Sequence, residues 1–172
     1  MALKEITASE MELSTLRIGG DWMLITAGTA ETGFNTMTAS WGHLGSIWGH
    51  GKDALTSVVY VRPQRYTKEF IDQGEFFTLC FFGEEYRKVL QVCGSKSGRD
   101  MDKVKECNLT VKTAECGAPY FEEAELVLVC RKRYCQEMDA NQMPEDIKEK
   151  WYPNKDYHVM YISEIVEALQ KK

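Results

Sequence analysis

The chain has no long hydrophobic run, no internal repeat and no low-complexity tract. Its N-terminal segment, MALKEITASEMEL, carries charges at Lys4, Glu5 and Glu10 and offers no apolar stretch of the length that a signal peptide or membrane span needs. The net charge of −5 and the pI of about 5.3 argue against a nucleic-acid or anionic-membrane surface. We therefore expect a cytoplasmic protein with no membrane or nucleic-acid partner.

The motifs of several enzyme classes are also missing. There is no G-x-S-x-G elbow, no H-E-x-x-H pair and no G-x-G-x-x-G fingerprint, and the histidines are only His43, His50 and His158. The six cysteines contain no C-x-x-C pair, so we expect no metal site. In a reducing compartment they should be free thiols that mostly pack in the core, although Cys107 and Cys116 stand in loop-like surroundings. A bound cofactor, not a side-chain nucleophile, would then carry any chemistry.

The 172 residues fit a single domain over residues 1–172. Hydrophobic patterning predicts strands over residues 22–28, 34–40, 53–61, 76–82, 124–138 and 157–169. Helices are predicted over residues 65–74, with Thr67 as N-cap and Gly74 as the stop, and over 84–94 and 100–107, whereas residues 143–153 fit a short helix or a loop. Because helices and strands do not alternate regularly, the pattern favours a mainly β, antiparallel fold. A small closed β-barrel with inserted helices fits best.

The stretch NTMTASWGHLGSIWG, residues 35–49, combines hydroxyl residues, glycines and two tryptophans. Aromatic rings stack on flat groups, and glycine-rich backbone exposes hydrogen-bonding groups. The stretch is therefore typical of a site for a flat ligand with a polar edge, with Trp41 close to it. The alternative is a strand end and glycine loop whose tryptophans serve packing.

Two further stretches carry positive charge. VRPQRYT, residues 61–67, places Arg62 and Arg65 at a predicted helix N-terminus, where anions bind readily. CGSKSGRDMDK, residues 93–103, combines small residues with basic side chains and could form an anion-binding nest. The alternatives are a solvated turn for the first stretch and a helix cap with a flexible loop for the second. His158 stands at a predicted strand start, where a hydrogen-bonded structural histidine is the alternative to a functional one.

Taken in order, NTMTASW, VRPQRYT, FFTLCFF, CGSKSGRDMDK and DYHVMYISEIV resemble the flavin reductase-like, FMN-binding split-barrel family, and its flavoredoxin-type members in particular. The resemblance runs over about residues 22–166. It implies a six-stranded antiparallel Greek-key split barrel, built as a homodimer with FMN near the subunit interface. It also implies a flavin-dependent oxidoreductase.

The resemblance assigns roles to individual residues. Lining of the isoalloxazine is implied for Thr38, Ala39, Ser40 and Trp41, and contact with phosphate and ribityl for Arg62, Arg65 and Thr67. Ser95, Lys96 and Ser97 would lie next to the flavin, in the same subunit or across the dimer interface. The same motifs add Asn35, Met37 and Tyr66 to the cofactor-binding set, and His158 would lie near the open face of the flavin.

The sequence leaves three functions open. The first is an NADH- or NADPH-dependent reductase of flavin or another small acceptor, the second an electron-transfer flavoprotein reduced by a protein partner, and the third a non-redox, anion-binding barrel. The chain also departs from the family: GHGKDAL replaces a frequent Pro-Pro pair, and Ser163 replaces a glycine of the last strand. The first departure leaves the path of that loop open.

Overall fold

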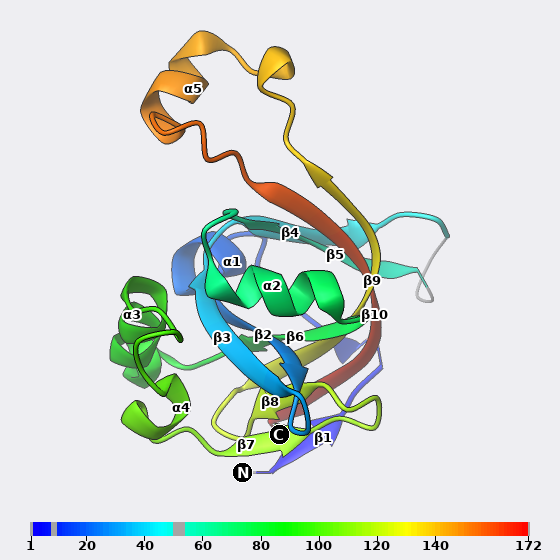
Figure 1. The fold of residues 1–172 in the computed structure, drawn as a ribbon. Helices are drawn as coiled ribbons and strands as arrows, with labels where there is room; N and C mark the ends of the chain where they lie inside the picture. Colours follow the sequence, from blue (N-terminus) through cyan, green and yellow to red (C-terminus); the bar gives the residue numbers. More distant parts are fainter. Residues whose placement is uncertain (1, 8–9, 50–53, 172) are drawn as a thin grey trace.

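The structure, a computed structural model of the chain, describes residues 2–7, 10–49 and 54–171. Eight strands, paired antiparallel, form its main sheet (Figure 1). They are β1 (Leu3–Glu5), β2 (Met23–Thr29), β3 (Gly33–Ala39), β4 (Gly42–Ser46), β5 (Leu55–Val61), β6 (Phe76–Phe81), β9 (Leu126–Glu137) and β10 (Val159–Lys171). A separate hairpin joins β7 (Val111–Thr113) to β8 (Pro119–Phe121).

The strand order is β3-β2-β6-β9-β10-β5-β4, and β1 pairs with the last residues of β10. The mainly β, antiparallel class with inserted helices is as predicted. The closed, six-stranded barrel is wrong, because the sheet has more strands and β3 and β4 stand unpaired with each other at its two ends. The sequence does not predict strand β4, because Gly42, Gly45 and Ser46 have low strand propensity.

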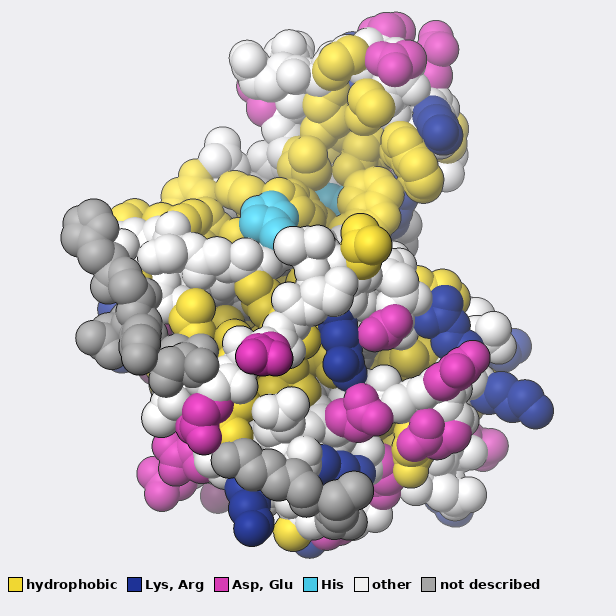
Figure 2. Space-filling view, turned by 180° about the vertical axis from the view of Figure 1, so that it is seen from behind, with side chains coloured by type: hydrophobic (Ala, Val, Ile, Leu, Met, Phe, Trp, Pro, Cys, Tyr) yellow, Lys and Arg dark blue, Asp and Glu magenta, His cyan; other side chains and the backbone are white. Residues whose placement is uncertain are grey.

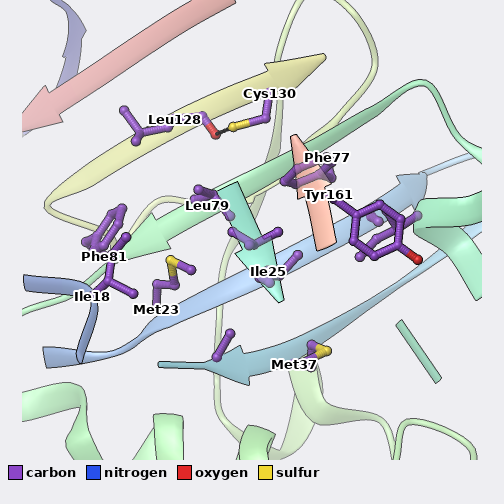
Figure 3. Packing of buried hydrophobic residues seen from close by; sticks show 14 of the residues in the cluster. Ile18, Met23, Ile25, Met37, Phe77, Leu79, Phe81, Leu128, Cys130 and Tyr161 are labelled. Carbon is purple, nitrogen blue, oxygen red and sulfur yellow. Dashed lines mark hydrogen bonds between the residues drawn. The ribbon is translucent and has the colours of Figure 1, made fainter. Parts of the chain in front are cut away.

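Successive strand residues point into two hydrophobic clusters on opposite faces of the sheet. Ile25, Leu79 and Leu128 belong to the inner cluster, which Figure 3 shows at close range. Their neighbours Leu24 and Cys80 belong to an outer cluster. Strand β6 pairs with both β2 and β9, so its predicted central place is confirmed.

The helices are α1 (Arg17–Asp21), α2 (Tyr66–Gln73), α3 (Arg87–Ser95), α4 (Lys103–Glu106) and α5 (Glu145–Trp151), with 3-10 turns η3 (Glu84–Tyr86) and η4 (Ala140–Gln142). Helix α2 packs Phe70 and Ile71 against the inner cluster and ends at Gly74, as predicted. Thr67 is not its N-cap. The helix begins at Tyr66 after Arg65, and the buried Thr67 hydroxyl instead accepts a hydrogen bond from Asn35.

Strands β9 and β10 extend past the body of the sheet and carry an arm, residues 138–158, that includes η4 and α5 (Figure 1). The register of their pairing shifts at two places along β10, which bends the long ladder. The long, bent strand predicted over residues 124–138 is thereby confirmed. The arm ends at His158, where the chain returns to the body.

Three cysteines, Cys80, Cys93 and Cys130, are buried in the two clusters, whereas Cys116 and Cys135 are exposed. Cys107 is half-buried and packs against the outer cluster, so the expectation of mostly packing cysteines holds for four of the six. None of the described helices is long and apolar enough to cross a bilayer. The predicted strand start at residue 53, His50 and most of GHGKDAL lie outside the described residues.

Lys103 offers a test of how the helices are held to the sheet. Its buried ammonium donates to Thr36 O at 2.8 Å and to Cys93 O at 2.9 Å, and so joins α4 to β3 and α3. Lys103→Met should lower the free energy of unfolding by about 2–4 kcal/mol, because two buried carbonyls lose their donor. Urea denaturation measures this, with the exposed Lys105→Met as control. Equal stability of the two variants would contradict the role.

Candidate functional site

A cavity of about 250 Å³ opens where β3 ends and β4 begins. It receives side chains from β3, β5, the start of α2 and the arm. Its lining comprises Met37, Thr38, Ala39, Ser40, Trp41, Tyr60, Arg62, Arg65, Trp151 and His158. An adjoining hollow of about 440 Å³ shares Thr38, Ala39, Ser40 and Arg65 with it and adds Trp22, Leu90, Gln91, Gly94 and Ser95. The two spaces therefore form one site on both sides of the β3 end.

Backbone groups at the end of β3 face this site. The Lys103 ammonium bonds Thr36 O, so the peptide groups of Thr36 point away from β2. Because peptide groups of alternate residues point to the same side of a strand, Thr38 N–H also points away from β2. No described residue accepts a backbone hydrogen bond from Thr38 or Ser40 at this edge. These N–H groups can therefore meet acceptor atoms of a ligand.

Aromatic rings line the other side of the cavity. Trp41 stacks on His158 with ring centroids 4.6 Å apart and an interplanar angle of 28°. Trp151 of the arm meets Trp41 edge-on at 5.2 Å. Tyr60 of β5 lies in the same lining. Such a wall suits a flat, polarisable ring.

Arg62 holds the arm against β5. Its guanidinium donates to Asp156 Oδ2 at 2.5 Å and to Trp151 O at 2.8 Å, and it lies over the Tyr152 ring at 5.2 Å. Gln64 donates to the same carboxylate oxygen at 2.8 Å. Hydrogen bonds from Gln64 and Arg62 keep the pKa of the Asp156 carboxyl below its usual value. Most of the hydrogen-bonding capacity of Arg62 is thus used within the protein.

Arg65 is differently placed. It precedes α2 and makes one hydrogen bond through its guanidinium, to Gly94 O at 2.6 Å, within the described residues. Burial, followed by the charge of nearby Arg62, lowers its pKa without removing its positive charge. Arg65 lines both hollows, and it has further N–H groups to donate. With two arginines and one aspartate, this end of the site favours an anion.

His158 is buried beneath Trp41, and its Nδ1 lies 2.9 Å from the Tyr152 hydroxyl. Burial, and next the charge of Arg62, lowers the pKa of this imidazole to about 4. The ring is therefore neutral at neutral pH. It is hydrogen-bonded, as the structural interpretation of the sequence expected, and it also lines the cavity.

Five of the residues in the predicted cofactor-binding set line neither hollow. Asn35 donates to Thr67 Oγ1 at 2.7 Å, and a side chain at Gly98 would collide with Asn35 Oδ1. The close approach of Gly98 to Asn35 therefore packs the 95–99 loop against β3. Tyr66 lies under Arg99, and the remaining two, Lys96 and Ser97, follow α3 and make local hydrogen bonds.

Sequence reasoning missed four lining residues that matter for the geometry: Tyr60, Trp151, Trp22 and Gly94. The sequence pattern predicts only a short helix or loop at Trp151 and gives this residue no role. Its approach to Trp41 depends on the arm folding back and on the Arg62–Asp156 pair, which no local pattern indicates. Trp22 has a positive φ of 68° between α1 and β2, which the strand pattern did not reveal.

Together these groups fit a flavin mononucleotide. Aromatic rings and exposed N–H groups match a flat ring with acceptor atoms along its edge, and Arg65 matches a phosphate. The described residues contain no cluster of three or more His, Cys, Asp or Glu side chains that could hold a metal.

A family model described as the flavin reductase like domain matches residues 16–172. The chain belongs to this family, and the resemblance drawn from the motifs is confirmed. No curated protein sequence matches the chain.

Solved structures share the fold. An FMN-binding protein from Thermus thermophilus has a TM-score of 0.68 and 17% identity, covering 89% of this chain and 73% of the other. A flavoredoxin from Methanosarcina acetivorans has a TM-score of 0.67 and 22% identity, with coverages of 88% and 69%. The styrene monooxygenase flavin reductase from Pseudomonas putida S12 has a TM-score of 0.61 and 17% identity, with coverages of 88% and 80%.

The buried, neutral His158 predicts a pH dependence of stability. Its pKa falls from 6.5 in the unfolded chain to about 4 in the folded protein, so the unfolded state binds more protons between these values. The free energy of unfolding should therefore fall by up to about 3 kcal/mol as the pH drops from 6.5 towards 4.

Urea denaturation across this pH range measures the effect. His158→Asn should remove that part of the slope, whereas His43→Asn, at an exposed position, should keep it. If the two variants have the same slope as the unmodified protein, His158 does not contribute as described.

Proposed function

We propose that the protein is an FMN-binding flavoprotein oxidoreductase. The observation that supports this most is the joined pair of hollows around the end of β3, which offers unpaired N–H groups, an aromatic wall and Arg65 in one site. Membership of the flavin reductase-like family points the same way. FMN, when bound, supplies reversible hydride and electron transfer at its ring.

The residues of the chain bind and shield this ring. Trp41 provides a flat aromatic face and Trp151, which stands edge-on to it, adds a second apolar wall, and the N–H groups of Thr38 and Ser40 serve the polar edge. Arg65 takes the phosphate, with the Gly94–Ser95 segment beside it. Arg62 adds positive charge but mainly keeps the arm in place through Asp156. No protein acid or base is needed for hydride transfer itself.

We propose NADH or NADPH as the electron donor and flavin or another small molecule as the acceptor. The second candidate is an electron-transfer flavoprotein reduced by a protein partner, which the fold shared with flavoredoxins favours. Stopped-flow reduction separates the two: rapid bleaching of bound FMN by NADH or NADPH supports the reductase, and resistance supports the carrier. Failure to bind FMN at all would favour a non-redox, anion-binding barrel.

We also propose a homodimer. Large apolar side chains are exposed on the single chain, and Figure 2 shows hydrophobic side chains gathered on the projecting arm and the adjoining body. The exposed large apolar residues include Tyr134, Ile147 and Trp151, on or beside the arm, and Trp48 after β4. Exposed apolar surface of this kind favours association.

Sedimentation velocity tests the homodimer. The account predicts a species of twice the 19.7 kDa chain mass, with FMN bound. A monomer with full flavin occupancy would show that one chain completes the site alone.

A phosphate-specific comparison tests the binding site. Arg65→Ala should weaken FMN binding by about 10- to 100-fold, because a charge-assisted hydrogen bond contributes about 1.5–3 kcal/mol. The affinity for riboflavin, which lacks the phosphate, should fall by about threefold or less. Quenching of flavin fluorescence in titrations measures both affinities.

Two further variants are controls for this comparison. Arg62→Ala should weaken FMN and riboflavin alike, because it releases the arm that carries Trp151. Arg131→Ala, which removes a guanidinium from β9 outside both hollows, should change neither. Equal losses of FMN and riboflavin in Arg65→Ala would rule out its phosphate role.

A further inference from the structure

Tyr152 is an arm residue that reaches the site from behind His158. It follows α5, is only 3% exposed, and stands edge-on to the His158 ring with centroids 5.6 Å apart. The Arg62 guanidinium lies over its ring, at 5.2 Å from the ring centroid. Tyr152 is therefore held firmly, although it comes from a segment that projects from the body.

The Tyr152 hydroxyl has two acceptors within reach. His158 Nδ1 lies at 2.9 Å and Met138 Sδ at 3.7 Å. A thioether sulfur is a weak acceptor, whereas an unprotonated imidazole nitrogen is a strong one. The hydroxyl proton therefore goes to Nδ1. In a neutral imidazole the ring proton then sits on Nε2, because only one of the two nitrogens carries it.

The second ring nitrogen opens to the cavity. His158 belongs to the cavity lining, and its Nε2 has no hydrogen-bond partner among the described residues. Within the same residues, the side-chain polar atoms that are sealed from solvent and make no hydrogen bond are Arg17 Nε and Asp156 Oδ1. His158 Nε2 is not one of them, so it is reachable from the cavity.

We propose that Tyr152 is a positioning residue that holds His158 in its Nε2–H tautomer, so that the site presents a neutral hydrogen-bond donor beside Trp41 to an acceptor atom of the bound ring. This inference rests on the proposed flavin function for the identity of the ring. The Nδ1–H tautomer would instead present a bare acceptor nitrogen, which repels the carbonyl oxygens and unprotonated nitrogens of a flavin edge.

The charged groups around His158 agree with a neutral donor. Arg62 and Arg65 disfavour the imidazolium form, and Asp156, which favours it, is already bonded to Arg62 and Gln64. The ring thus stays neutral at neutral pH, and its tautomer determines what the cavity offers. Because Tyr152 belongs to the arm, the Arg62–Asp156 pair supports this donor as well as Trp151.

Nitrogen-15 NMR of the imidazole rings tests the tautomer in the protein without FMN. With only three histidines, His158→Asn identifies the His158 signals. Near pH 7.5 the unmodified protein should show His158 protonated at Nε2, with Nδ1 as a hydrogen-bonded acceptor. Tyr152→Phe keeps the ring but removes the hydroxyl, so the Nδ1–H tautomer should gain population, and the Nδ1 and Nε2 resonances should move towards each other. Tyr157→Phe, next to Tyr152 in the same arm, is the matched control and should leave the His158 signals unchanged.

FMN titration gives the second result. Tyr152→Phe should bind FMN about three- to tenfold more weakly than Tyr157→Phe, the loss of about one hydrogen bond. An Nδ1–H tautomer in the unmodified protein, or an Nδ1 signal that Tyr152→Phe leaves in place, overturns the proposal. Equal FMN affinities of the two variants overturn it too. If the unmodified protein binds no FMN, the flavin function itself fails, which is a separate outcome.

Discussion

Strands β3 and β4 stand at the two ends of the strand order of the main sheet, yet only Ser40 and Trp41 separate them along the chain. Three peptide steps span at most about 10 Å, so the two outermost strands must approach each other at this point. They approach without pairing, which leaves the peptide groups at the end of β3 free of a ladder partner on that side. The site exists because the sheet curls almost into a barrel and stays open there.

The rest of the structure serves this opening. Helix α2 covers the inner cluster, and Arg65, which precedes it, lies beside the opening, while Lys103 holds α3 and α4 against β3. From the opposite side the arm contributes Trp151, Tyr152 and His158. The Arg62–Asp156 pair, partly shielded from water, joins this arm to β5. One ion pair thus connects two parts of the site that are far apart in the chain.

Much of the fold could be predicted from local pattern. The apolar strand at β6, the helix that ends at Gly74 and the long strand before the arm all carry strong hydrophobic periodicity or clear end signals. Strand β4 could not be predicted, because its pairing with β5 stabilises a sequence with little intrinsic strand preference. The openness of the sheet depends on strand order, which local periodicity does not contain.

The residues of the site also divide into those that the sequence indicates and those that it does not. Thr38 to Trp41, Arg62, Arg65 and His158 could be found because they stand in motifs that carry the family resemblance, and all of them line the cavity. Asn35 and Thr67 belong to the same motifs, yet they bond to each other beneath the surface. The arm residues Trp151 and Tyr152 could not be found, because their approach to the site results from tertiary contacts across the fold.

The visible absorption spectrum of the purified protein, mixed with excess FMN and then desalted, tests the central claim most directly. The account predicts that the bands of oxidised flavin stay with the protein at about one FMN per chain, shifted from those of free FMN by the aromatic wall at Trp41. A protein that emerges colourless from desalting, with no flavin retained, would contradict the view that the opening between β3 and β4 is a flavin site.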